Sequence, residues 1–129
     1  MKKAISTPKA PAAIGPYSQG IIAEPGSFIF TAGQIPLVPE TGEMRNANIE
    51  EATEQVLKNL QEVLAAGSAS MDDVVKVTVF MTDLSEFSAM NEVYSKFFKE
   101  RPPARSAVQV AALPKGARIE IEAIARVRK

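Results

Sequence analysis

The run DVVKVTVFM at residues 73–81 places the strictest demand on the fold. It is strongly β-branched, and Val and Phe fall on both of its faces, which is typical of a strand in the centre of a sheet. A segment with helical apolar periodicity precedes it and another follows it. We therefore expect an α+β domain in the order β-β-α-β-α-β-β, with two helices on one face of a mixed sheet. A length of 129 residues fits a single domain spanning 1–129.

The first helix is predicted over 48–67. Asn48 can cap its start with Glu51 at capping-box spacing, and Gly67 can end it. Its predicted buried face consists of Ile49, Ala52, Thr53, Val56, Leu60, Val63 and Leu64.

The second helix is predicted from about 84 to 99, capped by Asp83 and ended by the Pro102–Pro103 pair. Its apolar stripe consists of Leu84, Phe87, Tyr94 and Phe98, with Met90 and Phe97 beside it.

The remaining strands are predicted at the two ends of the chain. Residues 17–24 and 27–35 form two candidates separated by EPGS, which favours a hairpin turn. Residues 105–113 and 118–128 give the last two strands, and the Ala- and Pro-rich first seventeen residues are expected to run extended. Two helices cover only one face of such a sheet. The other face still carries apolar residues, so we expect a homo-oligomer.

Composition removes several kinds of chemistry. The chain has no cysteine and no histidine, which excludes disulfides, thiolate nucleophiles, zinc sites built from Cys or His, and a Ser-His-Asp triad. Neither standard Gly-rich phosphate loop is present, and no clustered Asp/Glu pattern suggests a metal. Proton transfer in an enzyme without a cofactor would then rest on Asp, Glu, Tyr, Lys, backbone or water.

Charge and hydropathy argue against two kinds of partner. Fifteen basic and fifteen acidic residues give a formal net charge of zero, so composition gives no support for nucleic-acid binding. No apolar run is long enough to span a membrane, and no apolar stretch follows the N-terminal lysines as in a secretory signal. We expect a cytoplasmic protein.

Arg105 stands at the start of the strand in RPPARSAVQV, with no acid nearby in that stretch. One interpretation is a structural salt bridge to an acid on a neighbouring strand. The other is a bidentate clamp for a ligand carboxylate, since the planar guanidinium matches two carboxylate oxygens.

Five further positions leave a similar choice open. Glu120 and Glu122 are either solvated charges or, for one of them, a partly buried acid fit for proton transfer. Asn91 interrupts the second helix's apolar stripe and needs a hydrogen bond or a ligand. Tyr17 either packs at the rim of the core or meets a ligand. Gly33 is either a bulge glycine or presents its N–H to an anion.

Six segments carry a further signal, namely APAAIGPYSQG, TAGQIP, ATEQVLKNL, VVKVTVFMTDL, MNEVYSKFF and PPARSAVQVAALPKGARIEIEAIA. Together they resemble the reactive intermediate deaminase family, also called the RidA or YjgF family. The resemblance runs from about Pro11 to Val127, and the last block is its most specific part.

The resemblance implies a chorismate-mutase-like domain assembled as a homotrimer, with the sheets packed inward and clefts between subunits. It also implies hydrolysis of 2-imino acids, such as 2-iminobutanoate and 2-iminopropanoate, or their enamine tautomers, to 2-keto acids and ammonia. Such hydrolysis protects pyridoxal-phosphate enzymes and needs no cofactor and no metal.

Residue by residue, the resemblance assigns the carboxylate-binding role to Arg105 and the water-positioning acid to Glu120. It places Tyr17, Gly33, Asn91 and Ala107 in the same cleft. Two positions depart from the family pattern: Ala107 replaces a common cysteine, and Ala32 replaces a common serine.

Other functions remain to be weighed. The leading alternative is a non-catalytic module that binds a small carboxylate such as a 2-keto acid. Ribonuclease activity is also described in this family, but the neutral charge and the absence of histidine argue against acid–base RNA cleavage here.

Overall fold

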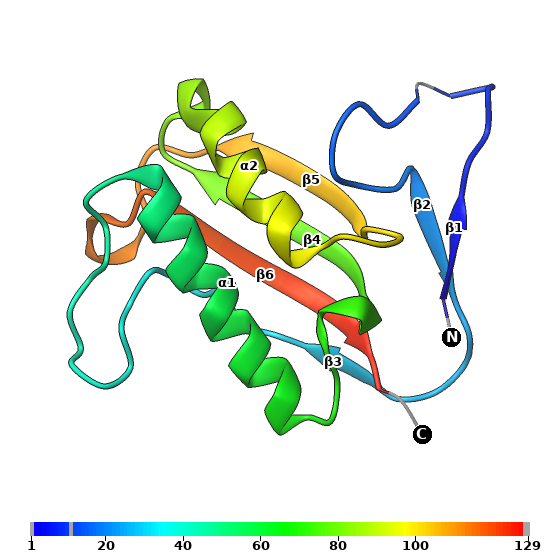
Figure 1. The fold of residues 1–129 in the computed structure, drawn as a ribbon, viewed down its shortest axis with the longest axis horizontal. Coiled ribbons are helices and arrows are strands. Elements are labelled where there is room, and N and C mark those ends of the chain that lie inside the picture. The colour runs from blue at the N-terminus through cyan, green and yellow to red at the C-terminus, as the bar shows by residue number, and fades with distance from the viewer. Residues whose placement is uncertain (1, 11, 128–129) are drawn as a thin grey trace.

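A four-stranded mixed sheet forms the centre of the protein in a computed structural model that describes residues 2–10 and 12–127 (Figure 1). β4 (Val74–Met81) lies between β6 (Ile119–Arg126), to which it is antiparallel, and β5 (Ala104–Gln109), to which it is parallel. β3 (Phe28–Phe30) pairs with the other edge of β6. The prediction of a central strand at 73–81 is confirmed.

Both helices lie on the same face of this sheet (Figure 1). α1 (Ile49–Ala66) packs against β6 and against α2 (Phe87–Phe97). The core between the layers is made of aliphatic side chains, chiefly from α1, β4 and β6. The predicted fold class, a mixed sheet with two helices on one face, is confirmed.

The capping chemistry of α1 follows the sequence closely. The Asn48 side chain accepts a hydrogen bond from the Glu51 N–H at 2.8 Å, and Gly67 ends the helix. The buried face differs at two positions: Leu57 is fully buried, whereas Val63 is 37% exposed. The apolar face of α1 is therefore rotated from the predicted one.

α2 begins later than predicted. Asp83 caps a short 3₁₀ turn, Leu84–Glu86, by accepting a hydrogen bond from the Ser85 N–H at 2.9 Å. Leu84 belongs to that turn and is exposed, so it lies outside the buried stripe that the periodicity assigned to it. Met90 and Tyr94 are buried as expected.

The hairpin predicted at EPGS is wrong. β2 (Gly20–Ala23) pairs with β1 (Lys2–Ile5), a strand that sequence periodicity missed, and these two form a separate sheet. The EPGS turn therefore connects two sheets. It is held from β6, where the Arg126 side chain donates hydrogen bonds to the carbonyls of Glu24 at 2.7 Å and Pro25 at 3.0 Å.

β1 is anchored by a buried lysine. Lys2 donates a hydrogen bond from Nζ to the carbonyl oxygen of Val74 at 2.6 Å. Burial lowers the pKa of Lys2, and Asp72 acts in the opposite direction. A four-residue segment with two lysines carries little apolar periodicity, which is why its pairing could not be read from the sequence.

The face of the sheet opposite the helices carries several exposed apolar side chains. Phe30 is 72% exposed, and Phe28 on β3 and Val108 on β5 are also accessible. No helix within the described residues is both long and apolar enough to cross a membrane.

The rotated face of α1 gives a direct test of the packing. Leu57→Ala removes a fully buried side chain and should lower the free energy of unfolding by about 2–5 kcal/mol. Val63→Ala on the same helix is the matched control and should cost about 0.5 kcal/mol. Chemical denaturation of both variants measures the difference. Equal costs would contradict the helix orientation described here.

Candidate functional site

A cavity of about 270 Å³ opens between the N-terminal segment, α2 and β5. It is lined by Ile14, Gly15, Tyr17, Phe87, Asn91, Arg105 and Ala107. Four of the sequence-predicted site residues are therefore brought together here, namely Tyr17, Asn91, Arg105 and Ala107. One wall is apolar, and a single cation, Arg105, is the only charged group among these lining residues.

The parallel pairing of β5 with β4 directs Arg105 toward the helices. Arg105 lies opposite Val77 and Ala107 lies opposite Val79, and both valines are fully buried under the helix layer. Alternation along β5 then turns Arg105 and Ala107 to the same face. From that position, Arg105 Nη1 donates a hydrogen bond to Asn91 Oδ1 on α2 at 2.7 Å.

The guanidinium of Arg105 has no carboxylate partner among residues 2–10 and 12–127. Burial lowers its pKa, while Tyr94 and Tyr17 act in the opposite direction. Within the same residues, the Arg105 side chain makes one hydrogen bond, from Nη1 to Asn91. The Nε and Nη2 donors are therefore available to a ligand. A salt bridge to a neighbouring strand, one of the two interpretations of Arg105, is not formed within the described part of the chain.

Tyr17 reaches the cavity because the segment before β2 is bound to the start of β5. The Ser18 N–H donates to the carbonyl of Pro103 at 3.0 Å, and the Ser18 hydroxyl donates to the carbonyl of Pro102. Proline lacks an N–H but keeps its carbonyl acceptor, so these prolines end the preceding segment and still hold Ser18. Tyr17 lies next to that anchor, with the Arg105 guanidinium over its ring.

Glu120 and Gly33 form a second pair, away from this cavity. A Cβ atom at Gly33 would lie 1.8 Å from Oε2 of Glu120 and 2.7 Å from its Cδ, so the carboxylate occupies the space that any other residue at 33 would fill. Gly33 is held there by its neighbours, since Thr31 and Gln34 hydrogen-bond to the backbone of β6.

Arg105 and Glu120 point to opposite faces of the sheet. On β4, the partner of Arg105 is Val77 and the partner of Glu120 is Phe80, three residues further along. Because side chains alternate along a strand, an odd separation places them on opposite faces. One chain therefore holds two part-sites: the Arg105 cavity on the helix side, and the Gly33–Glu120 pair on the open side.

Sequence reasoning treated Phe87 and Tyr94 as core residues only and did not single out Ile14 and Gly15. Phe87 lines the cavity, and the guanidinium of Arg105 lies over the rings of both aromatic residues. The sequence did contain a signal for the two aromatic residues. Phe87 and Tyr94 stand at helical spacing from Asn91, so they share a helix face with that predicted site residue.

The PKGAR block has a structural role beside the site. Arg118 donates from Nε to the carbonyl of Asn46 at 2.9 Å and from Nη1 to Oε2 of Glu86 at 3.3 Å. Gly116 adopts a left-handed backbone with φ 68°, which favours glycine. This block fixes the start of β6 and thereby the position of Glu120.

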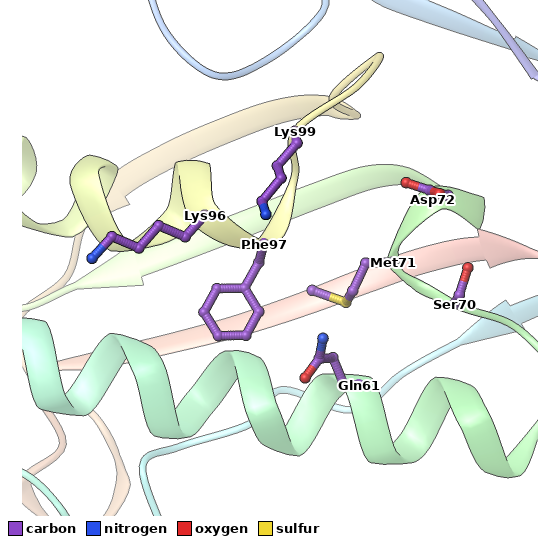
Figure 2. A pocket seen from close by; sticks show the side chains of 7 residues that line it. All are labelled: Gln61, Ser70, Met71, Asp72, Lys96, Phe97 and Lys99. Carbon is purple, nitrogen blue, oxygen red and sulfur yellow. The ribbon is translucent and has the colours of Figure 1, made fainter.

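A larger cavity of about 390 Å³ lies on the helix side, between α1 and the end of α2 (Figure 2). It is lined by Gln61, Ser70, Met71, Asp72, Lys96, Phe97 and Lys99. In Figure 2 the Lys96 side chain extends away from the other groups. None of the predicted site residues lines it, and its polar groups do not converge, so the smaller cavity at Arg105 is the better candidate. The described residues contain no cluster of three or more Asp and Glu side chains that could hold a metal ion.

A family profile described as "Endoribonuclease L-PSP" matches residues 7–127. The chain belongs to this family. It is 55% identical to a RutC family protein of Pyrococcus abyssi, over 96% of each chain. It is 46% identical to human 2-iminobutanoate/2-iminopropanoate deaminase, over 97% of this chain and 90% of the human protein.

A solved structure agrees with this placement. The crystal structure of E. coli TdcF with bound serine superimposes with a TM-score of 0.75 at 48% identity, covering 98% of this chain and 99% of the other. The predicted resemblance to the reactive intermediate deaminase family is confirmed.

The contact between Gly33 and Glu120 predicts the effect of a single methyl group. The backbone of Gly33 is outside the left-handed region, so Gly33→Ala adds no backbone strain. It should instead displace the Glu120 carboxylate and lower the free energy of unfolding by about 1 kcal/mol.

In a Glu120→Ala background the same substitution should cost almost nothing, because the colliding group is gone. Denaturation of the two single variants and the double variant completes the cycle. An equal cost in both backgrounds would mean that Gly33 acts through its backbone and not by making room for Glu120.

Proposed function

We propose that this protein hydrolyses reactive 2-imino acids and their enamine tautomers, such as 2-iminobutanoate and 2-iminopropanoate, to 2-keto acids and ammonia. The observation that carries this proposal is the Arg105 guanidinium, which lies in a cavity with no carboxylate partner within the described part of the chain. Family membership and the similarity to the human deaminase support the same reaction class.

Arg105 binds the substrate's carboxylate. Its free Nε and Nη2 donors form a fork that suits two carboxylate oxygens, and the half-buried setting strengthens such a charge-assisted pair. Fixing the carboxylate also fixes C2, the carbon that water attacks, and so reduces the entropic cost of the reaction. Ile14, Phe87 and Ala107 offer an apolar wall to a short aliphatic side chain.

Glu120 positions the water and moves protons. An enamine protonated at carbon gives the iminium, and an imine gives the same iminium when the Glu120 carboxyl protonates its nitrogen. Water then attacks C2 and gives up a proton to the Glu120 carboxylate, which forms a carbinolamine. That proton passes to the amino group, the C–N bond breaks as the C=O bond forms, the hydroxyl proton returns to Glu120, and ammonia leaves. One carboxyl that alternately gives and takes a proton suffices for this sequence.

The two part-sites meet only between copies of the chain. Arg105 and Glu120 of one chain face opposite sides of the sheet, so they cannot both reach one ligand. A homotrimer that packs the open sheet faces together and forms clefts between subunits would join the Arg105 cavity of one copy to Glu120 of the next. Exposed Phe28, Phe30 and Val108 on the open face support such an assembly.

Two other functions have less support. A module that only binds 2-keto acids would use the Arg105 cavity but would not need Glu120. RNA cleavage is suggested by the family's descriptive name, yet the net charge is zero and the sequence has no histidine. The cytoplasmic location stays a prediction from sequence.

The role of Arg105 can be tested with an imine-trapping assay. Threonine dehydratase supplies 2-aminocrotonate and 2-iminobutanoate, and semicarbazide traps the imine unless a deaminase removes it first. The wild type should lower semicarbazone formation, whereas Arg105→Ala should lose about 100- to 1000-fold in kcat/KM because the carboxylate loses its partner. Arg105→Lys is the matched control and should retain part of the activity, since it keeps the charge but not the fork.

The variants must keep the same oligomeric state for this comparison to hold. If Arg105→Ala dissociates the assembly, Arg105 is a structural residue. If the wild type leaves the semicarbazone signal unchanged, the proposed activity is wrong for 2-iminobutanoate.

The role of Glu120 separates an enzyme from a binding module. Glu120→Gln keeps the size of the side chain but cannot take up a proton. We expect a loss of about 100- to 10,000-fold in kcat with binding of 2-oxobutanoate retained, as measured by calorimetry. Unchanged turnover would favour the binding module.

Mixed assemblies test whether the site is shared. If Arg105 and Glu120 act across a subunit boundary, co-refolding equal amounts of Arg105→Ala and Glu120→Gln chains rebuilds intact sites. Random mixing in a symmetric oligomer restores roughly a quarter of wild-type activity. No recovery above the two separate variants would show that both residues must come from one chain.

A further inference from the structure

Arg105 raises a problem of electrostatics that the proposed function leaves unsolved. Removing a cation from water is costly unless it is paired, and burial lowers the pKa of this group. The described part of the chain offers it no acid and a single hydrogen bond, to Asn91 Oδ1. Other groups around the guanidinium must supply the compensation.

Three aromatic rings surround it. Arg105 Cζ lies over the rings of Tyr17, Phe87 and Tyr94, at 5.4, 5.2 and 4.8 Å from their centroids. All three distances are within the roughly 6 Å range of a cation–π interaction. Phe87 and Tyr94 stand on α2 on either side of Asn91, so one helix face presents a ring, an amide and a ring to the strand that carries Arg105.

Aromatic rings around Arg105 leave it better able to bind a ligand carboxylate than an acidic side chain would. An aspartate or glutamate at this place would bind the same fork of donors that a ligand carboxylate needs. A ring face attracts the charge but carries no oxygen acceptor on its surface, so the Nε and Nη2 donors remain available. Asn91 takes only Nη1.

We propose that Phe87 and Tyr94 are positioning residues for Arg105: their ring faces hold the guanidinium in place of an acid, so that its charge and donor fork stay available to a ligand carboxylate. The inference rests on the carboxylate-binding role of Arg105 in the proposed function. It assigns to α2 a part in binding that goes beyond packing in the core.

Tyr94 acts through its ring and not through its hydroxyl. The hydroxyl oxygen is buried and has no hydrogen-bond partner within the described residues, and burial raises the pKa of Tyr94, which keeps the group neutral. The ring is further fixed by Phe98, whose centroid lies 4.6 Å away. A phenyl ring at this position should therefore serve as well as the phenol.

The test uses binding of 2-oxobutanoate, measured by calorimetry on the intact protein, together with steady-state kinetics. Phe87→Leu keeps an apolar side chain but has no ring face, and it should weaken binding and raise KM by about 5- to 30-fold. Because Phe87 also lines the cavity, kcat is measured beside KM, and the larger change should be in KM. Phe87→Tyr restores a ring and should bind within about twofold of the wild type.

Two further variants separate positioning from general packing. Phe97→Leu changes an aromatic residue on the same helix that lines the other cavity and is not one of the three rings around Arg105, and it should leave binding unchanged. Tyr94→Phe should also bind within about twofold of the wild type. A double-mutant cycle combines Phe87→Leu with Arg105→Ala, and each variant's free energy of unfolding is measured. The two destabilising effects should be non-additive, because the two side chains interact.

The proposal is overturned if Phe87→Leu binds 2-oxobutanoate as the wild type does, if Phe97→Leu weakens binding equally, or if the cycle is additive. It is also overturned if the wild type does not bind 2-oxobutanoate. The binding and unfolding measurements need no turnover. If imine hydrolysis is absent but Phe87 and Arg105 are still coupled, the proposed activity is rejected and the inference is kept.

Discussion

The parallel pairing of β4 and β5 is the constraint on which the site depends. Parallel neighbours need a crossover, and α2 is that crossover. The same connection that completes the sheet therefore lays Phe87, Asn91 and Tyr94 over the strand that carries Arg105. The candidate cavity is therefore a direct product of the topology.

The second constraint is that two helices cover only one face of the sheet. The covered face gives Arg105 a half-buried setting, and the open face receives Glu120 above Gly33. A fold of this kind separates its cation from its acid within each chain. That separation keeps the two from neutralising each other, and in the proposed reaction the use of both residues would depend on assembly of copies.

The sequence predicted the elements with strong periodicity and failed where pairing depends on distant partners. The cap at Asn48 and the central strand at 73–81 are local signals, and both are confirmed. The partner of β2 was missed because Lys2–Ile5 carries no clear apolar pattern. For the site, residue type and family resemblance named Arg105 and Asn91. Their mutual hydrogen bond follows only from the packing of α2 on β5, and the opposite orientation of Glu120 follows only from strand register.

Ala107 stands where the family resemblance implies a cysteine, and the structure shows the setting of this residue. Ala107 is held in the ladder opposite Val79, so its backbone is fixed by the strand whatever its side chain. Compared with the cysteine that the resemblance leads us to expect there, alanine changes the cavity wall by one sulfur atom and leaves the strand that carries Arg105 as it is. A contribution made through the backbone at this position is preserved. The change should therefore affect how the substrate's side chain fits the apolar wall more than how its carboxylate is bound.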